Sequence, residues 1–306
     1  MKYIALILVC CSHLLTVSAG SISDSIPELP LPKVPTTLRE PSVRATYIIE
    51  HFWDEMDFRD TLRSHNREFM EQNFSNFISI FPYSNKQAQQ TAIATLLHKA
   101  EADNSAYIVL RDIAEKYLYE PNSPMLSEEY YILFLEHFVQ SPILGTTVKN
   151  RLRWQLEAAR KNRPGMTAAD FEYITHNGSK TTLHKTITGQ DLLLIFYDPD
   201  CEHCKETMAE LQADNTLSNA INSKKIKVLA IYSGDDYDLW KRTTALLPVN
   251  WSIGYDTGML QENGSYVLRA MPTLYLIDSN KKVVLKDVLP AQLFSLLRSY
   301  ATPSAY

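Results

Sequence analysis

The hydrophobic pattern of this 306-residue chain changes its period at Pro164-Gly165, and no other feature constrains the fold as strongly. From Val43 to Arg163 the apolar residues recur every three or four positions, which is the spacing of amphipathic helices. After Gly165 short apolar runs alternate with helical segments, which is typical of an α/β domain. We therefore predict an all-helical domain over residues 43–165 and an α/β domain over residues 166–306.

The helical half contains several apolar stripes without a fixed repeat, so a solenoid is not favoured. Breaks in the pattern fall at residues 82–84, 103–104 and 121–124, and Ser127 followed by two glutamates is typical of a helix start. We expect five or six helices. The clearest stripe consists of Met70, Phe74, Phe77, Ile78 and Phe81.

The α/β half contains two continuous apolar runs, residues 192–197 and 226–232, which are typical of strands buried on both faces. Each precedes a helical segment, at residues 201–220 and 237–246. The other expected strands and the last helix cover residues 171–175, 181–185, 251–255, 273–278, 282–286 and 291–300. This order predicts a mixed sheet flanked by helices.

The first residues have the layout of a secretory signal. Lys2 precedes the apolar run Tyr3–Val9, and Val17-Ser18-Ala19 supplies the compact residues that a signal peptidase recognises. The apolar run is shorter than the roughly 20 residues that a membrane-spanning helix needs. We predict a signal peptide over residues 1–19, cleaved after Ala19, and export to the periplasm or cell envelope.

Acylation of Cys11 or Cys10 is the alternative, and it would tether the protein to a membrane as a lipoprotein. The residue before either cysteine, Cys10 or Val9, is not the small one that this processing normally requires, so cleavage after Ala19 is preferred. Residues 20–42 contain five prolines and few large apolar side chains. We interpret them as an extended linker.

The overall composition disfavours one class of partner. Hydrophobic residues make up 45% of the chain and charged residues 21%, and the net charge of -5 comes from interspersed acids and bases. A nucleic-acid-binding protein would normally carry a basic patch. We therefore expect no nucleic-acid partner.

The cysteines indicate the chemistry. The chain has four, and cleavage after Ala19 would leave only Cys201 and Cys204. An exported protein with a large core and one close-spaced pair is not a disulfide-stapled scaffold. A zinc site is disfavoured because a closed structural site needs four ligands, and no second cluster accompanies Cys201, His203 and Cys204. We predict a redox-active pair that uses no metal and no cofactor.

This pair stands where a buried strand gives way to a helix. A cysteine in the first turn of a helix faces unpaired N–H groups and the positive end of the helix dipole, and both stabilise a thiolate. The thiolate is the attacking species in disulfide exchange, and the two-residue spacing lets the second thiol resolve the mixed disulfide. We predict Cys201 as the exposed nucleophile and Cys204 as the buried resolving thiol.

Three neighbouring side chains would tune the redox potential. Positive charge on His203 would favour the thiolate of Cys201, whereas Glu202 and Asp200 would disfavour it. A solvent-facing His203 without a redox role is an equal alternative. Because these effects oppose each other, the sequence leaves open whether the protein reduces, oxidises or isomerises its substrates.

These motifs resemble the thioredoxin superfamily, specifically its exported TlpA/ResA-like branch. The resemblance covers residues 167–300 and rests on Asp198-Pro-Asp-Cys-Glu-His-Cys204 after one apolar strand and Met271-Pro272-Thr273 before another. It implies a thioredoxin-like sandwich, a cis-proline at Pro272, and a substrate contact at Met271, whose backbone would pair with the substrate chain. It also implies exported protein thiols and disulfides as substrates, and an upstream thiol–disulfide donor.

Two positions depart from the family pattern. Asp200 replaces the aromatic residue that commonly precedes the first cysteine, and Ile195 stands where thioredoxins often bury a carboxylate. Asp198 and Glu202 are the local candidates for the proton-transfer role of that carboxylate. The N-terminal half, including residues 51–58, resembles uncharacterised helical domains that precede thioredoxin folds in some Gram-negative envelope proteins.

The predicted function is therefore that of a thiol–disulfide oxidoreductase of the cell envelope. The alternative is a non-catalytic scaffold, in which the helical domain binds a partner and the thioredoxin fold is a docking module with a structural disulfide. Absent turnover with a model disulfide, together with tight partner capture by residues 43–163, would favour the scaffold.

Overall fold

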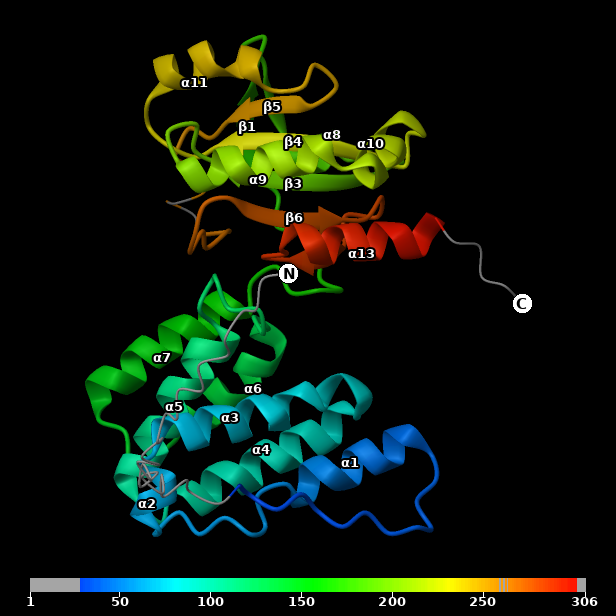
Figure 1. The fold of residues 1–306 in the computed structure, drawn as a ribbon. Coiled ribbons are helices and arrows are strands. Elements are labelled where there is room, and N and C mark those ends of the chain that lie inside the picture. Colours follow the sequence, from blue (N-terminus) through cyan, green and yellow to red (C-terminus); the bar gives the residue numbers. More distant parts are fainter. Residues whose placement is uncertain (1–27, 259, 261, 263, 302–306) are drawn as a thin grey trace, which may run out of the picture.

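The computed structural model describes residues 28–301 except residues 259, 261 and 263. The predicted signal peptide and the first part of the predicted linker lie outside the described residues. Figure 1 shows a helical bundle built by the N-terminal half and an α/β sandwich built by the C-terminal half. The predicted fold class, an all-α domain followed by a mixed sheet flanked by helices, is confirmed.

The described part of the helical domain has more helices than the five or six expected, because short ones such as α2 are single turns. Polar side chains start several of them, and the predicted start at Ser127 is confirmed because its hydroxyl accepts the Tyr130 N–H. The elements are α1 (Pro41–His51), α2 (Thr61–Ser64), α3 (Arg67–Ser79), η1 (Phe81–Tyr83), α4 (Lys86–Ala100), α5 (Asn104–Leu118), α6 (Glu128–Phe138) and α7 (Thr146–Ala159).

The predicted apolar stripe on α3 forms the centre of the helical core. Phe74 packs against Phe134 of α6 with ring centroids 5.5 Å apart, and Phe77 packs edge-on against Phe81 at 4.9 Å. All four rings are fully buried. Leu29, from the predicted linker, is also buried in this core, and α1 begins at Pro41, before the expected end of the linker.

The α/β domain is built on a seven-stranded mixed sheet with the order β2-β1-β5-β4-β3-β6-β7. Central β3 runs parallel to β4 and antiparallel to β6. The strands are β1 (Glu172–Thr175), β2 (Lys180–Thr182), β3 (Asp191–Tyr197), β4 (Ile226–Tyr232), β5 (Ser252–Tyr255), β6 (Thr273–Ile277) and β7 (Val283–Lys286). The continuous apolar runs of β3 and β4 are buried on both faces, as the sequence predicts.

Helical elements lie on both faces of this sheet, most of them on one face and the single turn α8 on the other. One face of β3 packs in a core shared with residues of α9, α10, α11 and α13, and the other face packs in a core with α8 and the segments around Phe171 and Tyr266. The helical elements are α8 (Leu183–Thr186), α9 (Glu202–Ala213), α10 (Asn215–Asn222), α11 (Tyr237–Thr243), η2 (Thr244–Leu246) and α13 (Pro290–Ala301).

Two expected elements differ in detail because polar side chains redirect the backbone. The strand expected over residues 181–185 ends at Thr182, whose hydroxyl accepts the Lys185 N–H and starts the single turn α8. The helix expected over residues 201–220 breaks at Asp214, whose carboxylate accepts the Leu217 N–H and starts α10. In both cases the side-chain cap offers the backbone an alternative to continuing the element.

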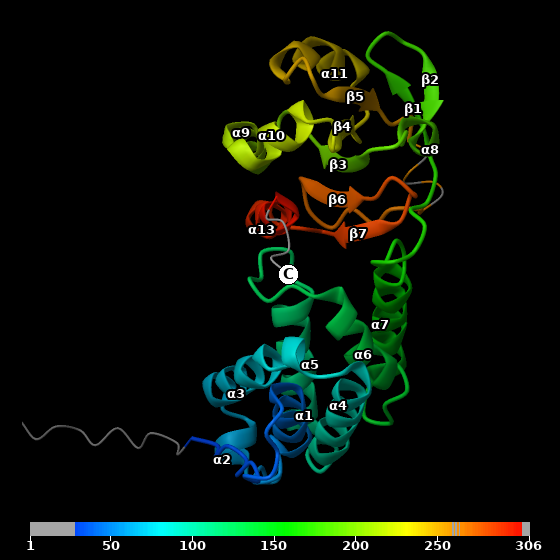
Figure 2. The same cartoon turned by 90° about the vertical axis from the view of Figure 1, so that its right-hand side faces the viewer.

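The two domains meet along the β7 edge of the sheet, which Figure 2 shows facing the ends of the helical bundle. Lys286 of β7 donates to the carbonyl of Lys161, just beyond α7, at 2.7 Å. Asn162 donates to the carbonyl of Ser265 at 2.8 Å and accepts the Ala169 N–H at 2.8 Å. Direct hydrogen bonds therefore hold the segment that connects the two domains. No helix within the described ranges is long and apolar enough to cross a membrane.

Glu115 provides a test of the helical packing. It lies on α5, makes a bidentate pair with Arg151 of α7, and accepts the Gln155 amide at 2.7 Å. Burial favours its protonated form, but Arg151 and Gln155 outweigh burial and hold the pKa of Glu115 below its ordinary value. We expect Glu115→Gln to lower the free energy of unfolding at pH 7 by about 1–3 kcal/mol, measured by urea denaturation.

The difference should depend on pH with a defined sign. Because the folded-state pKa of Glu115 is depressed, its contribution is fully present above the unfolded-state pKa and is lost as pH falls through the folded-state pKa. The gap between wild type and variant should therefore shrink in acid. Glu136→Gln is the control, because Glu136 forms only an exposed pair with Arg160. Equal stabilities of wild type and Glu115→Gln at pH 7 would contradict the assignment.

Candidate active site

The turn between β3 and α9 places both cysteines at one end of the sheet. Asp198 organises this turn, because its carboxylate accepts the Asp200 N–H at 2.8 Å and its carbonyl accepts the Cys201 N–H at 3.2 Å. Cys201 is the N-cap residue of α9, and the helix begins at Glu202. The sequence thus delivers Cys201 to the open end of a helix, where backbone N–H groups lack intrahelical partners.

The Cys201 sulfur lies among polar backbone groups. Its Sγ accepts the backbone N–H of Cys204 at 3.3 Å and lies 3.7 Å from the carbonyl oxygen of Met271. The residue is half-buried, so Cys201 is more accessible than the buried Cys204. Cys201 therefore combines access with a hydrogen-bond donor suited to a thiolate.

Cys204 occupies the opposite environment, one turn into α9. It is only 1% exposed and packs in the apolar core against the sheet. Burial raises the pKa of the Cys204 thiol to about 12, although the Asp198 backbone N–H, 3.5 Å from the sulfur, opposes this effect. Both thiols are free, so the structure represents the dithiol form. Cys204 is thus a protonated, shielded thiol beside an accessible one.

The segment before β6 forms the other wall of the site. Phe196 of β3 pairs with Thr273 of β6, so the antiparallel register brings the start of β6 beside the end of β3. The Met271–Pro272 peptide bond is cis, and the Thr273 hydroxyl donates to the Ala270 carbonyl at 2.6 Å. The structure therefore brings together all four predicted residues at the centre of the site, Cys201, Cys204, Met271 and Pro272.

The three predicted tuning residues lie on the outer side of the turn. The His203 side chain is 63% exposed, and its Nδ1 lies 3.6 Å from Glu206. Glu202 is more exposed and pairs with Lys205 at 3.3 Å, while Asp200 is exposed. No hydrogen bond joins any of these three side chains to either sulfur. Of the two carboxylates considered for proton transfer, Asp198 is the one whose charge raises the pKa of Cys204.

Two residues near the site were not predicted from the sequence. Tyr197, on the same face of β3 as Ile195, has a buried hydroxyl with no hydrogen-bond partner, and burial, with Asp198 and Cys204 nearby, raises its pKa. Arg269 lies two residues before Met271 and is 12% exposed. Period-two alternation along β3 could have indicated Tyr197, whereas no local pattern marks Arg269.

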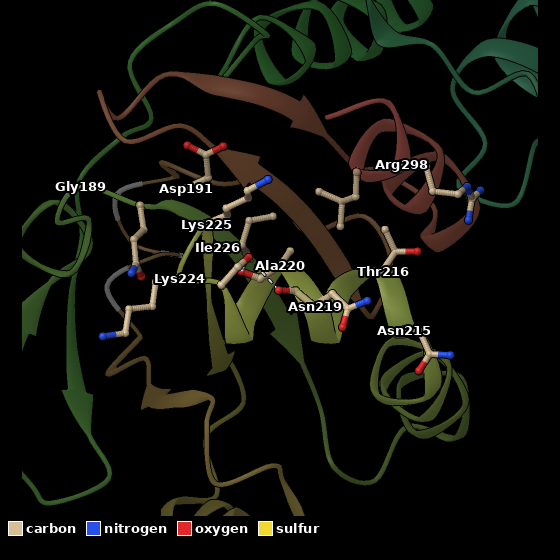
Figure 3. A pocket seen from close by; sticks show the side chains of 13 residues that line it. Gly189, Asp191, Asn215, Thr216, Asn219, Ala220, Lys224, Lys225, Ile226 and Arg298 are labelled. Atoms are coloured by element: carbon tan, nitrogen blue, oxygen red, sulfur yellow. Dashed lines mark hydrogen bonds between the residues drawn. The ribbon is translucent and has the colours of Figure 1, made fainter. Parts of the chain in front are cut away.

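A cavity of about 950 Å³ lies elsewhere in the α/β domain and is not part of this site. It is lined by Asp191 at the start of β3, Ile226 at the start of β4, and residues of α10 and α13, as Figure 3 shows. The cysteines follow the opposite end of β3. Because an extended strand rises about 3.3 Å per residue, they lie roughly 20 Å from the Asp191 end of this strand. Among the described residues no group of three or more acidic, histidine or cysteine side chains is arranged to hold a metal ion.

Two family models match parts of this chain. Residues 14–162 match a domain of unknown function, DUF5106, and residues 164–286 match the AhpC/TSA family. None of the curated proteins matches this sequence.

Among solved structures, a thioredoxin-like protein from Bacteroides caccae is 34% identical, covering 90% of this chain and 100% of its own with a TM-score of 0.83. The C-terminal domain of an uncharacterized protein from Bacteroides fragilis is 36% identical over 45% of this chain and 98% of its own, with a TM-score of 0.44. The thioredoxin domain of a thiol-disulfide oxidoreductase from Bacteroides vulgatus is 19% identical over 46% of this chain and 99% of its own, with a TM-score of 0.40.

The contrast between the two thiols predicts selective alkylation. Iodoacetamide at pH 7 should modify Cys201 of the reduced, folded protein and leave Cys204 unmodified, because Cys204 is buried and its raised pKa keeps it protonated. Peptide mass spectrometry would locate the label. In Cys201→Ser, Cys204 should react only after unfolding in guanidinium. Labelling of Cys204 before Cys201 would reverse the assigned roles.

Proposed function

We propose that this chain, which belongs to the thioredoxin-like family, exchanges disulfides through Cys201 and Cys204. Its AhpC/TSA domain follows a DUF5106 domain. The family is one of thiol–disulfide oxidoreductases. One observation carries the proposal for this chain. The Cys201 sulfur accepts the backbone N–H of Cys204 at the start of α9 and lies near the Met271 carbonyl. The Cys204 side chain is buried one helical turn farther along the chain.

In the reductive direction, the Cys201 thiolate attacks one sulfur of a substrate disulfide. The S–S bond of the substrate breaks, its second sulfur leaves as a thiolate and takes a proton, and Cys201 remains in a mixed disulfide. Cys204 then loses its proton and attacks Cys201 Sγ, which releases the first substrate sulfur as a thiol. The protein ends with a Cys201–Cys204 disulfide, and two electrons from an upstream dithiol donor restore the dithiol. The oxidative direction is the reverse.

Because the pKa of Cys204 is raised, a neighbouring group must accept its proton during the resolving step. A thiol with a pKa of about 12 does not ionise spontaneously at neutral pH, so the resolving step needs a group that accepts its proton. Asp198 lies in the turn before α9, and the negative charge of its carboxylate raises the pKa of Cys204. We assign the proton-accepting role to this carboxylate, because Ile195 stands where thioredoxins often bury one. The N–H of Asp198 would stabilise the Cys204 thiolate as it forms.

The proposed setting is the periplasm or cell envelope, with exported proteins as substrates. The support is the N-terminal sequence, in which Lys2, an apolar run and Val17-Ser18-Ala19 have the layout of a secretory signal. In this setting the substrate chain would align with the backbone at Met271 and Pro272.

Cysteine variants test the proposed chemistry. We expect Cys201→Ser to reduce disulfide exchange to the uncatalysed rate, because Cys204 is shielded from substrate. Cys204→Ser should accumulate a mixed disulfide through Cys201, visible as a mass increase that dithiothreitol reverses, because no resolving thiol remains. Ser218→Ala, on α10, is a control for substitution outside the redox turn.

The same measurement separates the proposed enzyme from a scaffold. A docking module with a structural disulfide would show no turnover in the wild type and no mixed disulfide in Cys204→Ser. Either result would remove the proposed chemistry and favour the scaffold, in which the helical domain captures a partner.

A further inference from the structure

Four charged side chains are buried together where the helical domain meets the redox domain. Arg269 precedes the Met271–Pro272 segment, Glu128 is the first residue of α6, Lys286 is the last residue of β7, and Asp287 follows it. Their side chains are only 7–13% exposed. Glu128 pairs with Lys286 at 2.6 Å and with Arg269 at 3.2 Å, and Arg269 pairs with Asp287 at 2.6 Å. The cluster contains two positive and two negative charges.

Arg269 is held mainly from the helical side of this cluster. Its guanidinium donates to the backbone carbonyl of Tyr119, at the end of α5, and stacks over the Tyr119 ring with 4.1 Å between Cζ and the ring centroid. Burial opposes the charge of Arg269, but Glu128 and Asp287 outweigh burial and hold its pKa above the ordinary value. A planar guanidinium with several fixed donors can serve all these partners together, which an ammonium group cannot.

The segment that Arg269 fixes is part of the redox site. Only Ala270 separates Arg269 from Met271, whose carbonyl oxygen lies 3.7 Å from the Cys201 sulfur. The helical domain also lines a small cavity beside this segment. A cavity of about 60 Å³ is lined by Pro121, Asn122 and Leu126 of the helical domain together with His203 and Pro272 of the redox domain.

We propose that Arg269 is a positioning residue for disulfide exchange and that the helical domain, through Glu128 and Tyr119, is what holds it in place. The inference rests on the proposed function. The DUF5106 domain is then a part of the redox site, since it sets the position of the backbone edge that receives a protein substrate beside Cys201.

This arrangement affects substrates unequally. A protein disulfide must align its chain with the backbone at Met271 before its sulfur reaches Cys201, so a displaced segment weakens binding. A small aromatic disulfide needs only access to the Cys201 sulfur. Loss of the Arg269 contacts should therefore raise KM for a protein substrate and leave reaction with the small disulfide nearly unchanged.

The test compares full-length variants with two substrates, insulin as the protein disulfide and 5,5′-dithiobis(2-nitrobenzoate) as the small one. Glu128→Gln, which leaves Asp287 as the one carboxylate paired with Arg269 in the cluster, should lower kcat/KM for insulin about tenfold, mainly through KM. Arg269→Met should lower it further, and Arg269→Lys should recover part of the loss. Reaction with the small disulfide should stay within about twofold of wild type.

Glu129→Gln is the matched control. Glu129 is the next residue on α6 and pairs with Arg163 at 2.5 Å in a more exposed position. Within the described residues, no hydrogen bond or ion pair joins Arg163 to the segment before Pro272. This variant should exchange insulin disulfides as the wild type does. Circular dichroism and thermal unfolding would show that each variant is folded, and if Arg269→Met is not, Glu128→Gln and Arg269→Lys carry the test.

The outcomes are distinct. Wild-type KM for insulin in folded Glu128→Gln and Arg269→Lys would overturn the positioning role and leave the proposed function intact. An equal loss with both substrates would also overturn it, because a general disturbance of the site would explain the result. A wild type that is inactive with both substrates would overturn the proposed function and this inference with it.

Discussion

The antiparallel pairing of β3 with β6 is the constraint on which the site depends. β3 ends where the redox turn begins, and β6 begins directly after Pro272, so only an antiparallel register brings these ends together. Leu192 to Phe196 pair in sequence with Ile277 to Thr273 without interruption. Since both strands are buried on both faces, a one-residue slip would move every side chain to the wrong core. Core packing therefore brings the Cys201 turn and the Met271 segment to the same end of the sheet.

The two thiols illustrate how one turn of helix can separate two chemical roles. Cys201 caps α9 and remains accessible, whereas Cys204 points into the core that α9 shares with β3. Burial alone makes Cys204 a poor acid, and the polar groups of the Asp198 turn are the local means of moving its proton. The replacement of a buried carboxylate by Ile195 is compatible with this arrangement, because the turn itself supplies a carboxylate.

The contact between the domains is unusual in its chemistry. Buried ion pairs are poor sources of stability, because the cost of removing charges from water can exceed their mutual attraction. Their geometric demands, however, can define one relative arrangement of two surfaces. Arg269, with partners in both domains, is suited to that role, and Lys286 adds carbonyl contacts beyond α7. We infer that the cluster fixes orientation more than it contributes to stability.

Local patterns in the sequence determined most of the fold and the centre of the site. The hydrophobic period separated the helical half from the α/β half, continuous apolar runs located β3 and β4, and the spacing of Cys201 and Cys204 indicated the redox turn. The predicted bounds of two elements were wrong because a single polar side chain determines where the backbone starts a new helix. Thr182 and Asp214 are the N-cap residues of these helices, α8 and α10. Such caps compete with the continuation of a strand or helix by a small difference in free energy, and the spacing of apolar residues gives no sign of it.

The tertiary structure alone decided how the two halves cooperate. Glu128, Tyr119 and Arg269 come from distant parts of the chain, and each taken singly looks like an ordinary helix-start, helix-end or loop residue. Their importance comes from being buried together, and burial of a charge is a property of the packed surfaces around it. The sequence therefore indicated the two cysteines of the proposed reaction, which lie close together in the chain, whereas the surroundings that position them arise only from long-range packing.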